Sequence, residues 1–393
     1  MRKFKGWLAL LGLVILLQAC GGGSATLTPS LSLTETIVVE PTATAPINAA
    51  TPFTEFFSPV PFRTGLGFRA PWLELYFIDP TNPFAQREVG GIDAIVSAAI
   101  LTAGQSVDVA MRYLSMESII DALITASRRG VTVRVVTESD NLTDSSHFQV
   151  LADSGIPIIG DQQPGLMNAS FIVIDHNQVW TGSADYDSSG IYKKYNAIVR
   201  LLSEEIAANY TKEFNEMFVN QQFGRLIVPE NPYPSVDIQG TQVEVLFSPD
   251  DFVVARLSQL LGEAQESIYF LAYSFASPDL GTIIRDRAAQ GVKVSGILEF
   301  DRVDPNRVDP NPDLLKELNL FRQTGLDVRL DGGPEVMYHK ILIIDGRIVV
   351  VGSYDFTGRA ENENDENVLI LHSEMIAQKF MEEFQRVQSR AQQ

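Results

Sequence analysis

The sequence has little cysteine and a shortage of positive charge, and each shortage excludes a class of protein. A single cysteine among 393 residues excludes an internal disulfide framework and a cysteine-based metal cluster. With 30 Lys and Arg against 49 Asp and Glu, the formal charge of -19 argues against a general nucleic-acid binder, which needs a basic surface to neutralise phosphates. A hydrophobic content of 45% excludes wholesale disorder, and the length is sufficient for two domains.

The N-terminus also lacks an apolar run long enough to span a bilayer. A basic start is followed by the uncharged run 6–19, which is shorter than the roughly 20 residues of a spanning helix. This is the pattern of a secretory signal. The letters LQAC at 17–20 resemble the bacterial lipoprotein box, which implies a signal peptide over 1–19 and acylation of Cys20. The protein is then exported and lipid-anchored in the bacterial cell envelope, with the leaflet undetermined; an ordinary signal peptide or an uncleaved anchor is the alternative.

The next segment contains few residues that can build a core. Residues 21–60 are rich in Thr, Ser, Ala and Pro and contain no Lys or Arg. This composition predicts a flexible tether, which we place at 20–65.

The remaining chain contains an internal repeat. Its matching blocks are LELYFIDP (73–80) with VEVLFSPD (243–250), SVDVAMRYLS (106–115) with SIYFLAYSFA (267–276), and FIVIDHNQVWTGSADYD (171–187) with ILIIDGRIVVVGSYDFT (341–357). We therefore predict a first half over 66–225, a Pro-rich linker over 226–241 and a second half over 242–393.

Each half alternates short apolar, β-rich runs with helical segments. ESIIDALITASRRG (117–130), for example, has apolar residues at helical spacing and ends in glycine. The pattern predicts an α/β fold (α+β in some schemes) with two pseudo-twofold-related halves, each a mixed β-sheet flanked by helices.

The repeated block, an apolar strand ending in Asp and followed by Gly-Ser-x-Asp, resembles the phospholipase D superfamily. That family carries two HxKxxxxD motifs, each followed by Gly-Ser and Asn or Asp, and then by Glu-Asn. The resemblance covers about residues 70–390. It implies one site where the halves meet, in which one histidine attacks a phosphodiester, the other handles the proton, and lysines hold the phosphoryl oxygens. It implies no metal and no cofactor.

The second half keeps most of this pattern but not its histidine. Tyr338 occupies the histidine position, and His339 is out of register, so on a strand it points away from the site. The motif positions that match the family are Lys340, Asp345, Ser353, Asp355, Glu366 and Asn367.

The first half departs further from the pattern. Asn168 occupies the histidine position, Ser170 occupies the lysine position, and Tyr195 is aligned with Glu366. The remaining matching positions are Asp175, Ser183, Asp185 and Asn196. Asp175 and Asp345 have an alternative interpretation as turn residues that accept backbone hydrogen bonds, and the Gly-Ser pairs as plain turns.

Two functions follow from these residues. One is a catalytically impaired, phospholipase D-like lipoprotein that binds a phosphate-bearing or other anionic ligand, or acts as a scaffold. The other is a working phosphodiesterase that hydrolyses a phospholipid headgroup or, less favoured by the acidic charge, nucleic acid. Tyr338 as a replacement nucleophile belongs to the second.

The Asp-rich loop 301–313 supplies oxygens that suit calcium. Its two Asp-Pro-Asn sequences are also ordinary turn sequences, and the spacing does not fit an EF-hand. We favour the turn interpretation and leave the calcium interpretation open.

Overall fold

The computed structural model describes residues 56–144, 146–224, 231–304 and 311–391. These residues belong to one compact unit, residues 53–393. The predicted signal peptide, Cys20 and the first part of the tether lie outside the described residues. Within the described ranges, no helix is both long enough and apolar enough to cross a membrane.

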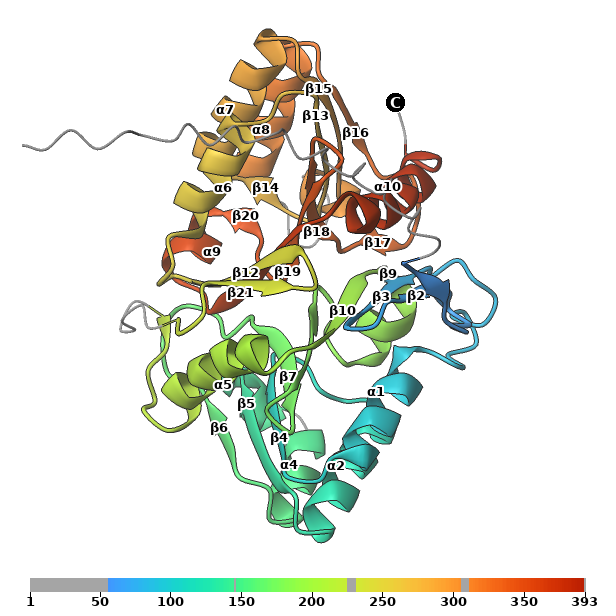
Figure 1. The fold of residues 1–393 in the computed structure, drawn as a ribbon, viewed down its shortest axis with the longest axis vertical. Helices are drawn as coiled ribbons and strands as arrows, with labels where there is room; N and C mark the ends of the chain where they lie inside the picture. The colour runs from blue at the N-terminus through green and yellow to red at the C-terminus, as the bar shows by residue number, and fades with distance from the viewer. Residues whose placement is uncertain (1–55, 145, 225–230, 305–310, 392–393) are drawn as a thin grey trace, which may run out of the picture. The chain divides into compact units, whose positions relative to one another are not determined.

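The first half forms a mixed sheet of nine strands in the order β1-β2-β3-β10-β8-β7-β4-β5-β6 (Figure 1). The strands are β1 (Ser58–Pro59), β2 (Gly65–Arg69), β3 (Leu73–Ile78), β4 (Ser106–Met111), β5 (Thr132–Thr137), β6 (Ile158–Gly160), β7 (Ser170–Ile174), β8 (Gln178–Gly182) and β10 (Ala197–Leu202). The helices are α1 (Ile92–Thr102), α2 (Glu117–Arg128), α3 (Ser139–Asp144), α4 (Ser146–Asp153), the π-helix η1 (Ser189–Lys193) and α5 (Glu204–Phe218).

The second half forms a mixed sheet of eight strands in the order β11-β12-β21-β19-β18-β13-β15-β16. The strands are β11 (Ser235–Ile238), β12 (Thr241–Ser248), β13 (Ser267–Ala272), β15 (Lys293–Leu298), β16 (Asp327–Leu330), β18 (Lys340–Ile344), β19 (Ile348–Gly352) and β21 (Glu366–His372). The helices are α6 (Val253–Gly262), α7 (Pro278–Ala289), the 3-10 helix η3 (Phe300–Arg302), α8 (Pro312–Gln323), α9 (Gly358–Asn362) and α10 (Glu374–Gln388).

The two sheets have the same topology. Counted from β2 in the first sheet and from β11 in the second, each strand has a counterpart at the same place in the other sheet. The last three strands of each order, β4-β5-β6 and β13-β15-β16, are parallel to one another. The predicted α/β fold with two related halves and mixed sheets is therefore confirmed.

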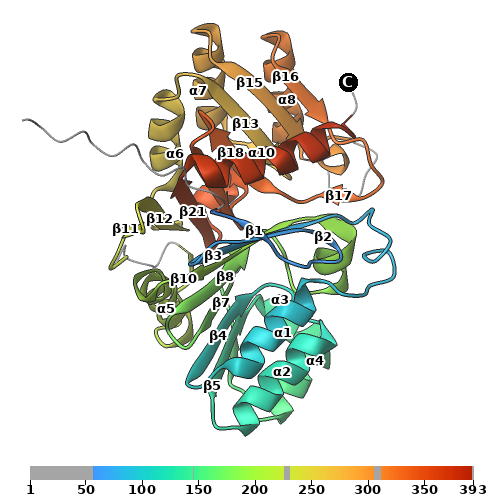
Figure 2. The same cartoon turned by 45° about the vertical axis from the view of Figure 1, so that its right-hand side comes forward.

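The two sheets separate two outer cores from one shared inner core. Apolar residues of α1, α2 and α4 pack against one face of the first sheet, while α6, α7 and α8 cover the equivalent face of the second (Figure 2). The opposite faces of both sheets, together with α5 and α10, form a single hydrophobic cluster. Both inner helices begin at a serine, Ser203 or Ser373, whose side chain accepts a backbone N–H of the first turn. The halves therefore share a buried interface built from the ends of the two repeats.

Two of the predicted boundaries are wrong. The tether was placed up to residue 65, but β1 pairs with β2 at the edge of the first sheet, and Phe62 is buried. The linker was placed up to residue 241, but β11 lies within it and pairs with β12. Short two-residue and four-residue edge strands carry little hydrophobic pattern, so composition alone did not separate them from a linker.

Candidate functional site at the interface of the halves

Two short backbone pairings bring the histidine positions of the two motifs together. The strand β17 (Val336–Met337) of the second half pairs with β9 (Lys194–Tyr195) of the first, and Tyr338 donates its N–H to the Tyr195 carbonyl at 3.0 Å. The pseudo-twofold equivalent is a bridge between Met167 and Asp365, next to which Asn168 donates its N–H to the Asp365 carbonyl at 3.0 Å. Asn168 and Tyr338 line one cleft of about 810 Å³.

The same symmetry corrects one residue assignment. Ile198 is opposite Gly182 in the first sheet, as Val368 is opposite Gly352 in the second. Asn196 therefore occupies the place of Glu366, and Ala197 that of Asn367. The alignment of Tyr195 with Glu366 was therefore wrong by one position. The first half has neither the glutamate nor the asparagine of the Glu-Asn pair at its motif position, so the sequence alone did not fix the strand register.

Lys340 lies beside Tyr338, as the strand alternation predicts. Its Nζ atom is 2.8 Å from Oδ1 of Asp355 and 4.0 Å from the centre of the Tyr338 ring. A second aromatic residue, Tyr273, has its ring centre 5.0 Å from the same ammonium group. Lys340 is buried, and its charge is balanced by a partly exposed carboxylate that lines the cleft.

Further basic side chains surround the two histidine positions. Nη1 of Arg112 is 3.4 Å from Oδ1 of Asn168, and Nζ of Lys194 is 4.3 Å from the centre of the Tyr338 ring. Arg302 has its guanidinium 5.1 Å from the centre of the Tyr273 ring and lines the cleft. Sequence reasoning missed all three. The repeat could have identified Arg112, because this residue occupies the place in the first repeat that Tyr273 occupies in the second.

Two buried carboxyl groups hold the chain directly before Asn168 and Tyr338. Glu138 accepts the N–H of Met167 at 3.1 Å, and Glu299 accepts the N–H of Met337 at 2.6 Å. Burial, followed by repulsion from Asp161, raises the pKa of Glu138 to about 7. Burial and the neighbouring Asp331 raise the pKa of Glu299 to about 8. The sequence analysis also missed these two positioning residues, although each directly follows the equivalent strand of its repeat: Glu138 follows β5 and Glu299 follows β15.

His339 points away from the cleft. Its side chain is fully buried, and Nε2 lies 2.6 Å from Oε1 of Glu383 in α10. Burial lowers the pKa of His339. The imidazole is therefore part of the inner core and has no access to a ligand in the cleft.

Asp175 and Asp345 lie at the other end of their strands from the cleft. Asp175 accepts the backbone N–H groups of residues 104–106, and Asp345 those of residues 265–267, at 2.7–3.1 Å. Burial opposes their ionisation, but these backbone hydrogen bonds keep the pKa of each carboxyl below its usual value. A direct part in chemistry at the cleft does not fit this position. They fix the turn that precedes β4 or β13.

The remaining motif residues form hydrogen bonds with one another next to the cleft. The hydroxyl of Ser183 donates to Asn196, and the hydroxyl of Ser353 accepts the backbone N–H of Asn367. Oδ1 of the Asn367 side chain accepts a hydrogen bond from the Thr181 hydroxyl across the halves at 2.6 Å. Ser170 donates to the Ala184 carbonyl and does not replace a lysine as a ligand-binding cation. These residues are buried and support the site rather than line it.

Burial raises the pKa of three site groups. It raises the pKa of Asp185 to about 6, and burial with repulsion from Asp355 raises the pKa of Glu366 to about 8. Burial and the carboxylates of Asp185 and Asp355 raise the pKa of Tyr338 well above its usual value. At neutral pH the phenol of Tyr338 is therefore protonated, and most molecules also carry a protonated carboxyl group at Glu366.

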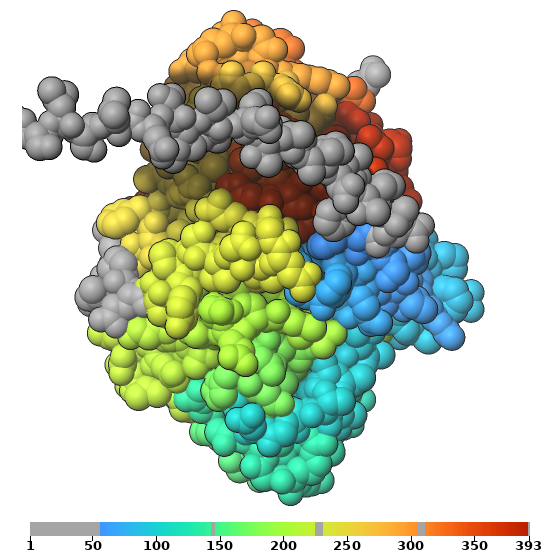
Figure 3. All heavy atoms as spheres, viewed as in Figure 1, coloured from blue at the N-terminus to red at the C-terminus, as the bar shows by residue number. Residues whose placement is uncertain are grey.

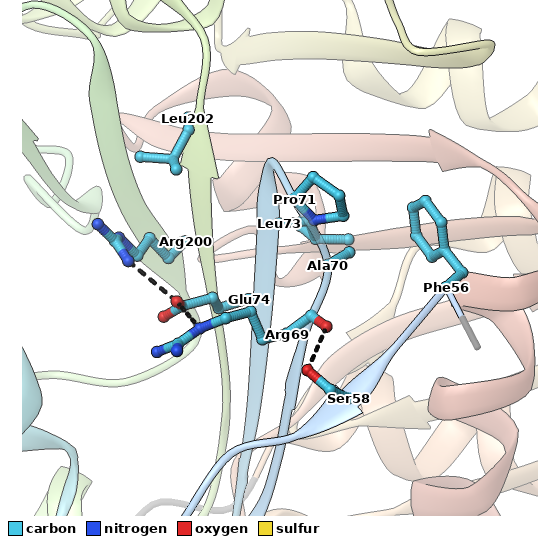
Figure 4. A pocket seen from close by; sticks show the side chains of 9 residues that line it. All are labelled: Phe56, Ser58, Arg69, Ala70, Pro71, Leu73, Glu74, Arg200 and Leu202. Atoms are coloured by element: carbon cyan, nitrogen blue, oxygen red, sulfur yellow. Dashed lines mark hydrogen bonds and ion pairs between the residues drawn. The ribbon is translucent and has the colours of Figure 1, made fainter.

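A second hollow lies away from this site (Figure 4). It has a volume of about 630 Å³ and contains Glu74, which pairs with Arg69 at 2.6 Å and with Arg200 at 3.0 Å. None of the repeated motif residues lines it, so it is not our candidate site.

The Asp-rich loop is described only at its ends. Asn311 caps α8 by accepting the N–H groups of Asp313 and Leu314, which is the turn role expected of Asn. Residues 305–310, with Asn306 and Asp309, lie outside the described residues, so the calcium interpretation stays untested. Among the described residues, the one group of carboxylates that converges closely enough for a metal lies elsewhere and is described below.

Comparison with known proteins identifies the fold and the family. A family model described as "Cardiolipin synthase, PLD-like domain" matches residues 96–218 and 257–388, well over half of the chain. Mitochondrial cardiolipin hydrolase of Homo sapiens is 32% identical over 134 residues, which are 34% of this chain and 50% of that protein. Phospholipase D of Rickettsia conorii is 26% identical over 150 residues, 38% of this chain and 71% of that protein. The chain thus spans about half the length of the cardiolipin hydrolase that it matches.

A solved structure supports the arrangement of the two halves. Phosphatidylserine synthase of Haemophilus influenzae Rd KW20 aligns over 82% of this chain and 88% of its own, with a TM-score of 0.60 and 15% sequence identity. The repeated sheets, the meeting of the two motifs at one cleft and the family match agree. The chain therefore belongs to the PLD-like family of the phospholipase D superfamily.

Proposed function

We propose that this protein is a PLD-like binding module that holds a phosphate-bearing or other anionic ligand in the interface cleft and has lost phosphodiester turnover. The observation that carries the proposal is the pair Asn168 and Tyr338. They occupy the two histidine positions and line the cleft, whereas His339 is buried against α10.

The two replacement side chains are poor participants in phosphoryl chemistry. The amide of Asn168 is not basic and does not form a covalent phosphoryl intermediate under ordinary conditions. The phenol of Tyr338 has its pKa raised well above the ordinary value by burial and by nearby carboxylates. A nucleophile or general base needs a pKa near the working pH, so Tyr338 is unsuited to either role.

Basic side chains gather at the two histidine positions and favour an anion there, although Asp313, Asp355 and Glu363 also line the cleft. Lys340, Lys194 and Arg112 approach the two histidine positions, and Arg302 lines the cleft. Arginine and lysine provide the hydrogen bonds and charge that phosphate oxygens need. A ligand phosphate in this place competes with Asp355 for the Lys340 ammonium group. The acidic balance of the whole chain, with a net charge of -19, favours a small or lipid-borne phosphate over a nucleic acid.

The relatives suggest the class of ligand. Their names refer to cardiolipin, phospholipase D and phosphatidylserine, all concerned with phospholipids. We therefore propose a phospholipid headgroup as the ligand. Export and acylation of Cys20 are part of this proposal, because an anchor would hold the cleft near a lipid surface. Labelling with a radioactive fatty acid should mark the wild-type protein and not a Cys20→Ser variant.

Titration calorimetry with inorganic phosphate, and flotation with phosphatidylcholine vesicles that contain cardiolipin, test ligand binding. We expect Lys340→Met to weaken phosphate binding by about tenfold or more, which corresponds to about 1.4 kcal/mol. Lys293→Met is a matched control, because Lys293 is exposed and lies at the opposite end of the second sheet from Lys340. Equal binding by wild type and Lys340→Met, or no binding by either, would overturn the proposal.

One observation favours the alternative, a working phosphodiesterase. Lys340, Asp355 and Glu366 remain together beside the cleft, with the Asp355 N–H donated to Glu366 at 2.8 Å. Such an enzyme needs a nucleophile that is not one of the family histidines. A turnover measurement separates the two functions and is described at the end of the Discussion.

A further inference from the structure

We propose that the carboxylates of Glu213, Glu216 and Asp250 form a binding site for one divalent, oxygen-preferring cation of the Ca²⁺ class. The first two lie on α5, in the first half, and Asp250 follows β12, in the second half. The site is separate from the interface cleft, whose lining includes none of the three.

The three carboxylates converge on one small cavity. One oxygen from each lies within 4.8 Å of the others. Ca²⁺ binds oxygen at about 2.3–2.6 Å, so two ligand atoms on opposite sides of the ion are about 4.6–5.2 Å apart. The cavity between them has a volume of about 10 Å³. This is about the smallest cavity that holds a single water molecule, so it admits no more than one ion.

Two of the three carboxylates are buried without compensation. Glu213 is 5% exposed and Asp250 is 8% exposed. Among the described residues, neither side chain accepts a hydrogen bond or forms an ion pair. Burial of an unpaired carboxylate costs several kcal/mol unless a proton or a cation neutralises it. Glu216 pairs at 3.2 Å with Lys212, which lines the same cavity and balances one charge of the group.

A neutral oxygen nearby also lacks a donor. Oδ1 of Asn231 is buried, has no hydrogen-bond partner among the described residues, and belongs to a residue that lines the same cavity. Its amide nitrogen donates to the Val245 carbonyl at 2.6 Å, and the side chain also hydrogen-bonds Asp251, which lines the same cavity; these contacts fix its orientation. An amide oxygen that cannot accept a hydrogen bond is a suitable ligand for a cation. This observation is independent of the acidic cluster and points to the same occupant.

The donor set selects the type of metal. Three carboxylates and one amide oxygen are hard ligands, and the cavity lining contains no histidine or cysteine. Zinc and copper sites in proteins usually rely on nitrogen or sulfur. Ca²⁺, Mn²⁺ or Mg²⁺ therefore fits better, and Ca²⁺ best tolerates an irregular arrangement.

A cation here would link the two halves. Helix α5 contacts β12 directly, and green and yellow atoms meet at this boundary in the space-filling view (Figure 3). Asp365, whose carbonyl holds the Asn168 N–H, is close enough to Glu213 to help raise its pKa. The ion would thus stabilise the interface on which the cleft depends, without touching a ligand in the cleft.

The test uses purified protein freed of metal with EGTA and titrated with CaCl₂, MnCl₂ or MgCl₂ at pH 8 and without phosphate. We expect one Ca²⁺ per chain with Kd of about 1 mM or tighter, in the range of calcium sites in extracellular modules, and a higher Tm. Glu213→Gln and Asp250→Asn should each weaken Ca²⁺ binding at least tenfold. Glu204→Gln, an exposed position on the same helix, should not.

The metal-free variants keep the test independent of folding. Glu213→Gln and Asp250→Asn remove an uncompensated charge, so without metal we expect each to unfold at a temperature no lower than metal-free wild type. Wild type that shows no binding at 10 mM of any of the three metals would overturn the proposal. Ca²⁺ binding that is equally tight in wild type and both variants would do so as well, since it would place the ion elsewhere. Neither result depends on whether the cleft binds phosphate.

Discussion

Nζ of Lys340 lies 2.8 Å from Oδ1 of Asp355 and 4.0 Å from the centre of the Tyr338 ring. The one lysine that the family motif retains is therefore held between an anion and an aromatic face. An anionic ligand competes with this carboxylate for the ammonium group.

Removing that competition should tighten ligand binding. Asp355→Asn keeps the size of the side chain but removes its charge, and we expect phosphate to bind about three- to tenfold more tightly, a gain of about 1 kcal/mol. Titration calorimetry at pH 7.5 checks this. Weaker binding in Asp355→Asn would mean that the carboxylate helps the ligand instead of competing with it.

The ring of Tyr338, and not its hydroxyl, should matter for binding. The ring lies beside both Lys340 and Lys194. Tyr338→Phe keeps this contact, so we expect phosphate affinity within about twofold of wild type, whereas Tyr338→Ala should lose severalfold because the two lysines are no longer held. A large loss in Tyr338→Phe, measured in the same titration, would assign a direct role to the phenol.

His339 should contribute to stability and not to ligand binding. It is fully buried and lies 2.6 Å from Glu383, which also pairs with Arg386 at 2.6 Å. His339→Ala leaves a cavity and removes one partner of a buried carboxylate, at a cost of about 2–3 kcal/mol in urea unfolding. The folded variant should bind phosphate like wild type. Weaker binding with unchanged stability would show that the histidine serves the site.

The stability of the protein should fall as the pH rises through neutrality. Burial and Asp331 raise the pKa of Glu299 to about 8. The unfolded chain releases this proton near pH 4.5 and the folded chain only near pH 8, so the contribution of this group to stability declines between the two. The maximum slope for one proton is about 1.4 kcal/mol per pH unit.

Asp331→Asn should weaken the decline of stability with pH. It removes the charge repulsion from Asp331, which after burial is the second cause of the raised pKa of Glu299. Urea unfolding of both proteins at pH 5 and pH 8, with EGTA present, provides the comparison. An equal loss of stability in wild type and Asp331→Asn would show that Asp331 does not set the pKa of Glu299.

The repeat allowed much of the fold to be predicted from the sequence. The strand that leads to Asp175 and the strand that leads to Asp345 carry the same pattern. Alternation along the extended segment that enters β18 correctly placed Tyr338 and Lys340 on one side and His339 on the other. The pairing of Asn168 with Asp365 and of Tyr338 with Tyr195 joins segments of different halves, which no local pattern specifies.

Other parts of the site depend on tertiary contacts. Arg112 reaches the cleft from the loop after β4, and Lys194 reaches the Tyr338 ring from β9. The carboxylates of Glu213 and Asp250 meet only because α5 packs against β12. In the sequence, Glu213 belongs to the polar pattern of an ordinary surface helix. Its burial follows from the shared core between the halves, which is set by the packing of both repeats together.

The most direct test of the central claim is turnover of bis-p-nitrophenyl phosphate and of phosphatidylcholine by the purified protein. Wild type and Lys340→Met should both show release of p-nitrophenol and choline at the rate of a buffer blank, under conditions in which wild type still binds phosphate. Release by wild type that disappears in Lys340→Met and persists in Lys293→Met would contradict the account, and would identify the cleft as a working phosphodiesterase site.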